Sequence, residues 1–405
     1  MSRLSWIVLV LAMAFPARAD DLPNGWEGAI RSEHVRPHVE FLASPELAGR
    51  SGADSVKAAE YLVKQFRTSK LRPLFANGSF EQLIPTIAAD DDGKSDSPNS
   101  GGGDDLPTKG PRIVGRNVGA WLEGSDPKLR DELIVIGVHF DHLGIRGGKT
   151  FRGADDNASG TAMMLEVARQ LAISKQRPKR SIVFVGFDLE EQLLWGSRWF
   201  VAHPPFELDR VKLFITADMI GRSLGDLPLQ TIFIMGSEHA PRMKLLLDDV
   251  GSPRGLEVAR LGIDLIGVRS DYGPFWGEKI PFLFFSTGEH PDYHTPRDVP
   301  EKLDFDKIAR VSSLVLKLVE ATANADGAPQ WTDEVQPDID EVKAIHRITE
   351  LLLEAGEKKP LTDLQRLIVT QAKNKCRQIL ERGTFSADDR KWLIRISQLL
   401  LLSVF

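Results

Sequence analysis

Short apolar runs, separated by polar or glycine-containing turns, recur through the middle of this 405-residue chain. These runs cover residues 133–138, 181–187, 211–216, 231–235 and 280–285. Their length and their content of β-branched and aromatic residues predict buried strands. Helical patterns separate the early runs, most clearly at 159–173. This alternation predicts an α/β fold with a mostly parallel central sheet flanked by helices.

Helical spacing of apolar residues also appears at both ends of this region. Residues 33–67 predict two helices around a turn. After a linker at 325–332, three further helices are predicted as a C-terminal extension, at 338–357, 361–383 and 387–404. The last is apolar over most of its surface but too short to cross a bilayer. We expect these helices to pack on the preceding domain, with self-association or a membrane contact as the alternative.

The first 19 residues have a different character. A positive start, an apolar run and the small residues Ala17 and Ala19 predict a cleavable signal peptide and therefore export, to the periplasm or outside the cell. An uncleaved N-terminal anchor is the alternative. The domain organisation expected is thus 1–19 signal peptide, 20–325 main domain and 326–405 helical extension. Within the main domain, residues 90–110 are rich in Asp and Gly and predict a flexible acidic loop.

Charge and cysteine content exclude several classes of protein. Removing residues 1–19 takes away Arg3 and Arg18, so 49 basic residues face 57 acidic ones and the net charge becomes −8. An acidic chain of this kind lacks the excess of basic residues expected of a nucleic-acid-binding protein. It also shows no strong signal for membrane binding, because it has no cluster of basic residues. Cys376 is the single cysteine, so no intrachain disulfide is possible. Stability is expected to come from the core and from bound metal.

Metal-ligand residue types follow the predicted strands. The first strand ends at His139, and Asp141 lies two residues later, where it can hold the second ring nitrogen of this histidine. His142 is a weaker candidate for a metal ligand. Next, the segment GADDNASG places two adjacent aspartates before a helix. Adjacent carboxylates repel unless a cation or hydrogen-bond donors lie nearby. One of the pair is therefore expected to bind metal, and a carboxylate can bridge two ions.

The later strands add four more candidates. Glu190 and Glu191 follow the second strand directly, so one can coordinate a metal while the other faces the water it activates. Asp218 ends the third strand, and His294 lies in a Pro-containing loop after the last, with Tyr293 beside it as a donor to a developing oxyanion. Carboxylates with two imidazoles and no thiolate suit zinc.

The motifs resemble those of the dizinc aminopeptidases of metallopeptidase family 28 (zinc-exopeptidase fold). The resemblance covers roughly residues 33–322 and includes LASPELAGR and RNVGAWLEGSDPKLRDELIVIGVHFDHLG. It implies two zinc ions per chain. Carried over by position, it makes His139 and Asp218 ligands of one zinc, Glu191 and His294 ligands of the other, and Asp156 the bridge.

The same resemblance assigns the catalytic roles. Glu190 matches the general base, and Asp141 matches the partner of the ligand histidine. Many members carry Ser-Asp-His before the last strand, whereas this chain has Ser270-Asp271-Tyr272, which makes Tyr272 a second substrate or oxyanion candidate. The implied reaction is removal of N-terminal residues from peptide substrates by a metal-bridging hydroxide.

Three alternatives stay open. Some relatives are carboxypeptidases acting on acidic dipeptides, but no cationic cluster to grip a terminal carboxylate can be located. Glutaminyl cyclases use one zinc and lack the full ligand set that is present here. Receptor-like relatives keep the fold and lose ligands. The intact set favours the aminopeptidase.

Overall fold

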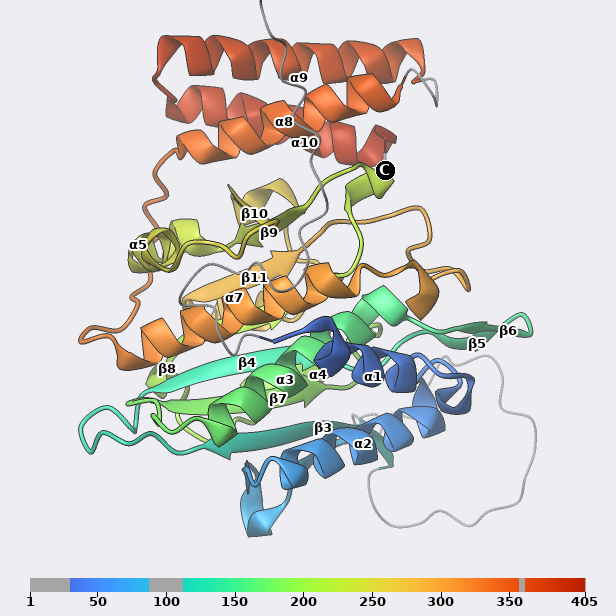
Figure 1. The fold of residues 1–405 in the computed structure, drawn as a ribbon, viewed down its shortest axis with the longest axis vertical. Helices are drawn as coiled ribbons and strands as arrows, with labels where there is room; N and C mark the ends of the chain where they lie inside the picture. The colour runs from blue at the N-terminus through green and yellow to red at the C-terminus, as the bar shows by residue number, and fades with distance from the viewer. Residues whose placement is uncertain (1–29, 87–111, 357–360, 405) are drawn as a thin grey trace, which may run out of the picture.

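The computed structural model describes residues 30–86, 112–356 and 361–404, with side chains described up to residue 399 (Figure 1). The predicted signal peptide at 1–19 and the acidic loop at 90–110 lie outside these segments, so both remain predictions.

A nine-stranded sheet forms the centre of the protein, in the order β1-β3-β7-β4-β8-β11-β9-β10, with β2 paired to β3. Strands β7, β4, β8 and β11 run parallel, as do β9 and β10, whereas β3 and β9 join this set antiparallel. The mostly parallel sheet predicted from the sequence is confirmed. Its strands are β1 (Arg72–Pro73), β2 (Glu81–Pro85), β3 (Ile113–Leu122), β4 (Leu133–His139), β7 (Ser181–Phe187), β8 (Val211–Ala217), β9 (Thr231–Met235), β10 (Glu257–Leu261) and β11 (Phe282–Ser286), and a separate hairpin pairs β5 (Gly144–Arg146) with β6 (Lys149–Phe151).

Helices cover both faces of the sheet, which explains why every residue of β4 and β7 is buried. On the face toward the viewer in Figure 1, α1, α2, α3 and α7 pack against one another, and α5 joins α7. Helices α4 and α6 pack together on β3, β8 and β11. The bounds are α1 (Ser32–Leu42), α2 (Ser55–Thr68), α3 (Gly160–Ile173), α4 (Trp195–Ala202), α5 (Pro241–Val250), α6 (Tyr272–Gly277) and α7 (Phe305–Asn324).

The strand order reverses direction at β4. From β4 the chain first adds β7 on one side and then β8 on the other. In open α/β sheets, ligands bind at the carboxyl ends of the strands where this reversal occurs. The residues that follow β4, β7 and β8 therefore lie where a fold of this kind binds its ligands.

Four strands of the central sheet were not predicted, and neither was the β5–β6 hairpin. Strands β1, β2 and β10 are short edge elements with little apolar pattern, and β3 is interrupted by glycines and by polar residues such as Asn117. A Cβ at Gly119 in β3 would lie 2.6 Å from the Leu74 side chain, which would have to shift to make room.

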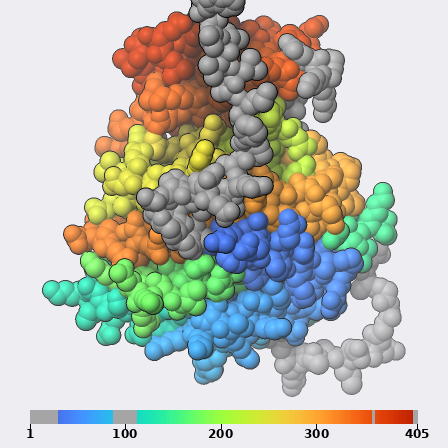
Figure 2. All heavy atoms as spheres, viewed as in Figure 1, coloured from blue at the N-terminus to red at the C-terminus, as the bar shows by residue number. Residues whose placement is uncertain are grey.

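The C-terminal extension is present as three helices, α8 (Ile339–Ala355), α9 (Asp363–Arg382) and α10 (Ala387–Val404). They stack beyond β9 and β10 as a layer at one end of the molecule (Figures 1 and 2, orange to red). Helix α8 packs on β10, and α10 packs on the short turn at Ile263–Leu265. Among the helices of the described segments, none has the length and apolar composition needed to cross a membrane.

Candidate metal centre

Four neighbouring parallel strands deliver the predicted side chains to one edge of the sheet. His139 is the last residue of β4, the Glu190–Glu191 pair follows β7, and Asp218 comes directly after β8. His294 lies in the loop that follows β11. Asp156 arrives on the segment before α3 rather than at a strand end. All six predicted side chains are brought together.

One cluster consists of His139, Glu190 and Asp218, whose ligand atoms all lie within 4.8 Å of one another. The His139 Nε2 atom is 3.4 Å from Asp218 Oδ1. His139 and Asp218 are the pair that the family resemblance assigned to one zinc ion. Glu190, expected to act as a base, is at the same place and close enough to face a molecule bound there.

The second cluster contains Asp156 and Glu191 with two histidines. Nε2 of His294 lies 3.1 Å from Asp156 Oδ2 and 3.2 Å from Glu191 Oε2. His142, which the sequence treated as a spare, also contributes, because its Nδ1 is 2.7 Å from Glu191 Oε1. It forms a compact potential metal group with Asp156 and Glu191. The structure therefore offers two histidines for the second ion where the sequence assigned one.

Asp156 lies between the two clusters. Its Oδ1 is 3.4 Å from His139 Nε2, while its Oδ2 is 3.1 Å from His294 Nε2. The two oxygens of one carboxylate thus face different groups, which is the arrangement a bridging ligand needs. Asp155, the neighbour that the sequence set aside, points elsewhere: its Oδ1 accepts a hydrogen bond from the backbone N–H of Gly221 at 2.6 Å.

The donor set fits cations better than it fits hydrogen bonds. Both ring nitrogens of His139 and of His142, one oxygen of Glu191 and one of Asp218 are buried without a hydrogen-bond partner. The facing atoms of His142 and Glu191, which lie 2.7 Å apart, are among these atoms. Buried polar atoms left unpaired cost free energy. Metal ions shared between these converging, unpaired atoms would remove that cost. Nitrogen and oxygen donors are ligands that suit zinc.

The electrostatics of the two clusters agree with this interpretation. Burial raises the pKa of Glu190 well above its usual range. Burial lowers the pKa of His139, but the carboxylates of Glu190 and Asp218 outweigh it and raise the pKa overall. Burial and the Glu191 carboxylate likewise raise the pKa of Asp156. This concentration of carboxylates is costly unless positive charge is close by.

Three non-glycine residues at or beside the ligands have a strained backbone conformation. Leu189, Met219 and His294 all have a positive φ, at 60°, 58° and 52°. Non-glycine residues rarely adopt this region, and the cost is accepted mainly at functional sites. Asp141 helps to hold the arrangement: one of its carboxylate oxygens accepts from the Glu190 N–H at 3.1 Å and lies 3.6 Å from His139 Nδ1.

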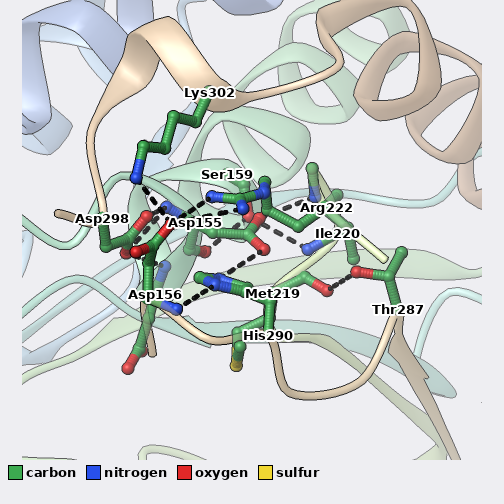
Figure 3. Close-up of polar contacts among 12 residues, drawn as sticks. Asp155, Asp156, Ser159, Met219, Ile220, Arg222, Thr287, His290, Asp298 and Lys302 are labelled. Carbon is green, nitrogen blue, oxygen red and sulfur yellow. Dashed lines mark hydrogen bonds and ion pairs between the residues drawn. The ribbon is translucent and has the colours of Figure 1, made fainter. Parts of the chain in front are cut away.

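A network behind Asp156 fixes its backbone (Figure 3). Both oxygens of the buried Asp298 carboxylate accept from the Asp155 N–H, at 3.0 and 3.1 Å, and one also accepts from the Asp156 N–H at 3.1 Å. Burial raises the pKa of Asp298 to about 6. Asp298 therefore orients the segment that carries the bridging candidate.

We expect Asp298→Asn to weaken zinc binding or turnover by about 10–100-fold, the usual scale for groups that support metal ligands. An amide with its oxygen at the Oδ2 position could still accept from both N–H groups, but its NH₂ group would then replace the oxygen that accepts from Asp155 and would face that N–H as a second donor. Metal affinity and kcat/KM measure the effect, and Asp306→Asn, an exposed change in the first turn of α7, is the matched control. Wild-type values for Asp298→Asn would show that the network does not position Asp156.

The two predicted tyrosines lie in different environments. Tyr293 stacks on His294, with ring centroids 3.9 Å apart, and lines the pocket at the metal centre. Tyr272 is fully buried, and its hydroxyl donates to the Gly267 carbonyl and accepts from the Arg269 N–H at 3.0 Å. These contacts suit a residue that shapes the loop over the pocket. Contact of either tyrosine with substrate remains a prediction.

Arg50 is a structural residue of this site that the sequence did not single out. It is fully buried, and its guanidinium donates to the carbonyls of Leu42, Phe140, Arg152 and Gly153 at 2.7–2.8 Å. It thereby joins the segment before α2 to the two loops that carry the ligands. The only sequence signal was its place at the end of LASPELAGR, which gives no indication of where its donors go.

Comparisons with known proteins agree with this geometry. Aminopeptidase YwaD of Bacillus subtilis is 27% identical over 215 residues, covering 49% of this chain and 43% of the relative. A glutaminyl-peptide cyclotransferase of Boiga dendrophila is 31% identical over 221 residues, covering 45% and 60%. The chain spans about half the length of the first curated relatives it matches.

Solved structures show the same fold. A zinc aminopeptidase from Bacillus subtilis aligns with a TM-score of 0.52 at 17% identity, over 76% of this chain and 99% of that one. A glutaminyl cyclase from Porphyromonas gingivalis aligns with 0.53 at 20%, over 72% and 98%. Residues 117–319, half of the chain and the part that holds every candidate ligand, match peptidase family M28. The chain is therefore a member of peptidase family M28.

Proposed function

We propose that this protein is a zinc-dependent aminopeptidase that removes N-terminal residues from peptides. The observation that carries the proposal is the pair of metal-ligand clusters joined by Asp156, with Glu190 beside the first. Bound there, two zinc ions would polarise the scissile carbonyl and lower the pKa of water from ~15.7 to about 7. His139 and Asp218 would hold one ion, and Glu191 with His294 the other; His142 is a further candidate for the second.

The residues of the chain supply the remaining steps. Glu190 accepts the proton of the attacking water and passes it to the leaving amine, a role that suits a carboxylate whose pKa burial has raised. Asp141 keeps His139 in one orientation and fixes the Glu190 backbone. The resemblance implies that the free α-amino group of a peptide also meets the metal site, which would restrict cleavage to the N-terminus.

Glutaminyl cyclisation is the competing function, because cyclases match this chain as well as aminopeptidases do. The second cluster favours hydrolysis, since the resemblance implies one zinc for cyclases and two for aminopeptidases. We also propose that the enzyme acts after export, which rests on the predicted signal peptide alone.

A matched set of three peptides tests the proposal. The first has a free N-terminal leucine, the second is its N-acetylated twin, and the third begins with glutamine. We expect the first to lose residues one at a time, the acetylated twin to stay intact, and the third to release glutamine. Equal cleavage of the twins would contradict an aminopeptidase. Loss of ammonia from the third peptide without shortening would identify a cyclase instead.

A further inference from the structure

The pocket at the metal centre extends to the C-terminal helices. Its cavity measures about 680 Å³, within the size range of small-molecule sites. Asp156, Glu190, Asp218 and His294 line it at the metal centre, and residues of α8 and α10 line it as well. The extension is therefore part of the wall of the site, although the nearest of these wall residues is about 50 positions beyond His294 in the sequence.

One face of α8 supplies most of this wall. Ile345, Ile348, Thr349 and Leu352 line the cavity, and their spacing of three and four residues places them on one side of the helix. Ile345 and Leu352 are each only 5% exposed, and Thr349 is fully buried. Ser397 on α10 adds a small polar residue whose buried hydroxyl has no hydrogen-bond partner.

Apolar side chains from the sheet form a further part of the cavity wall, which also includes the charged residues Asp264, Arg269 and Glu289. Phe233 and Met235 come from β9, Leu261 from β10 and Phe284 from β11. The polar ligands are thus confined to the metal centre, and the space beyond them is largely apolar. An apolar group of a ligand would be stabilised in this space, because binding there removes its surface from water.

The extension is fastened to the pocket by ion pairs. Arg390 of α10 contacts both oxygens of Asp264 at 2.6 and 2.7 Å, and also pairs with Glu341 of α8 at 3.1 Å. Asp264 itself lines the cavity, and its backbone carbonyl accepts from the Gln398 side chain at 3.1 Å. A bidentate Arg–carboxylate contact fixes orientation as well as distance. The loop that borders the cavity and the helices that close it are therefore held as one unit.

We propose that α8 and α10 form the specificity wall of the substrate pocket and select peptides whose N-terminal residue has a large apolar side chain. The proposal rests on the aminopeptidase function proposed above. The α-amino group and scissile bond lie at the metal centre, and the side chain extends over the β9 and β11 residues toward α8. Leu352 and Ser397 then set the size of side chain that is accepted.

Filling the wall from each helix tests this inference. Leu352→Trp and Ser397→Phe add bulk to the cavity from α8 and α10, and Glu354→Trp places the same tryptophan on the exposed side of α8 as a control. Alanyl- and phenylalanyl-p-nitroanilide are the substrates. We expect each filling variant to lower kcat/KM for the phenylalanyl substrate about 10-fold or more relative to the alanyl one. The control is expected to keep the wild-type ratio.

A binding measurement keeps this test separate from catalysis. Calorimetry on the zinc-loaded full chain gives the Kd of free L-phenylalanine and L-alanine, and each variant is first checked for wild-type zinc content and circular dichroism. If Leu352→Trp does not fold, Ser397→Phe decides alone, since its site tolerates partial exposure. Wild-type selectivity in a folded filling variant would overturn the inference. An inactive wild type would refute the proposed function, and loss of L-phenylalanine binding in the filling variants would still support the wall.

Discussion

Replacing Glu190 with glutamine is expected to reduce turnover by roughly 10²–10⁴-fold while leaving zinc bound, because that range is typical of a lost general acid–base group. The amide preserves the size of the side chain but cannot accept a proton from water. Glu190 reaches the His139–Asp218 cluster, and the resemblance gives the ligand role to Glu191, so metal content is expected to be retained.

Single-turnover kinetics and zinc analysis of the same preparation separate these effects. Glu207→Gln, a change at an exposed glutamate, is the matched control and is expected to behave as wild type. A Glu190→Gln variant with undiminished turnover would remove Glu190 from the mechanism. A variant that loses zinc would instead make Glu190 a ligand.

Asp156→Asn is expected to have the largest effect, because it alters both metal positions at once. The carboxylate has one oxygen directed to His139 and the other to His294. The amide keeps one oxygen, places N–H donors where the other was, and removes a negative charge. We expect zinc binding to fall below two ions per chain and turnover to become undetectable.

Zinc content after dialysis and turnover at saturating substrate measure this effect. Asp388→Asn, at an exposed position of α10, provides the control for loss of one carboxylate. If Asp156→Asn retained two zinc ions and normal turnover, the bridge would have to be another residue.

The ends of the buried strands were the predictable part of this protein. Uninterrupted apolar runs such as 181–187 identify a strand covered on both faces, and a polar residue at its end must find a partner. Parallel neighbours put such ends at one edge, so His139 and Asp218 were expected near each other, and the family resemblance then assigned both to one zinc ion. This argument cannot identify the role of Asp298, because its partners are backbone N–H groups 142 and 143 residues away in sequence.

Other features depended on contacts that no local pattern encodes. His142 follows no strand end directly, and its approach to Glu191 results from the turn after β4. The sequence predicted that the extension would pack on the main domain, which its apolar faces require. It did not predict that Thr349 and Leu352 would line the pocket, because helical spacing shows that a face is buried and not what it is buried against.

The central claim is that turnover depends on two zinc ions held by these clusters. The most direct measurement removes metal from the purified protein with a chelator and then adds zinc in steps, recording bound zinc and aminoacyl-p-nitroanilide hydrolysis together. We expect no hydrolysis without zinc and a plateau when about two ions per chain are bound, as the two clusters joined by Asp156 require. Full hydrolysis by the metal-free protein would contradict the account.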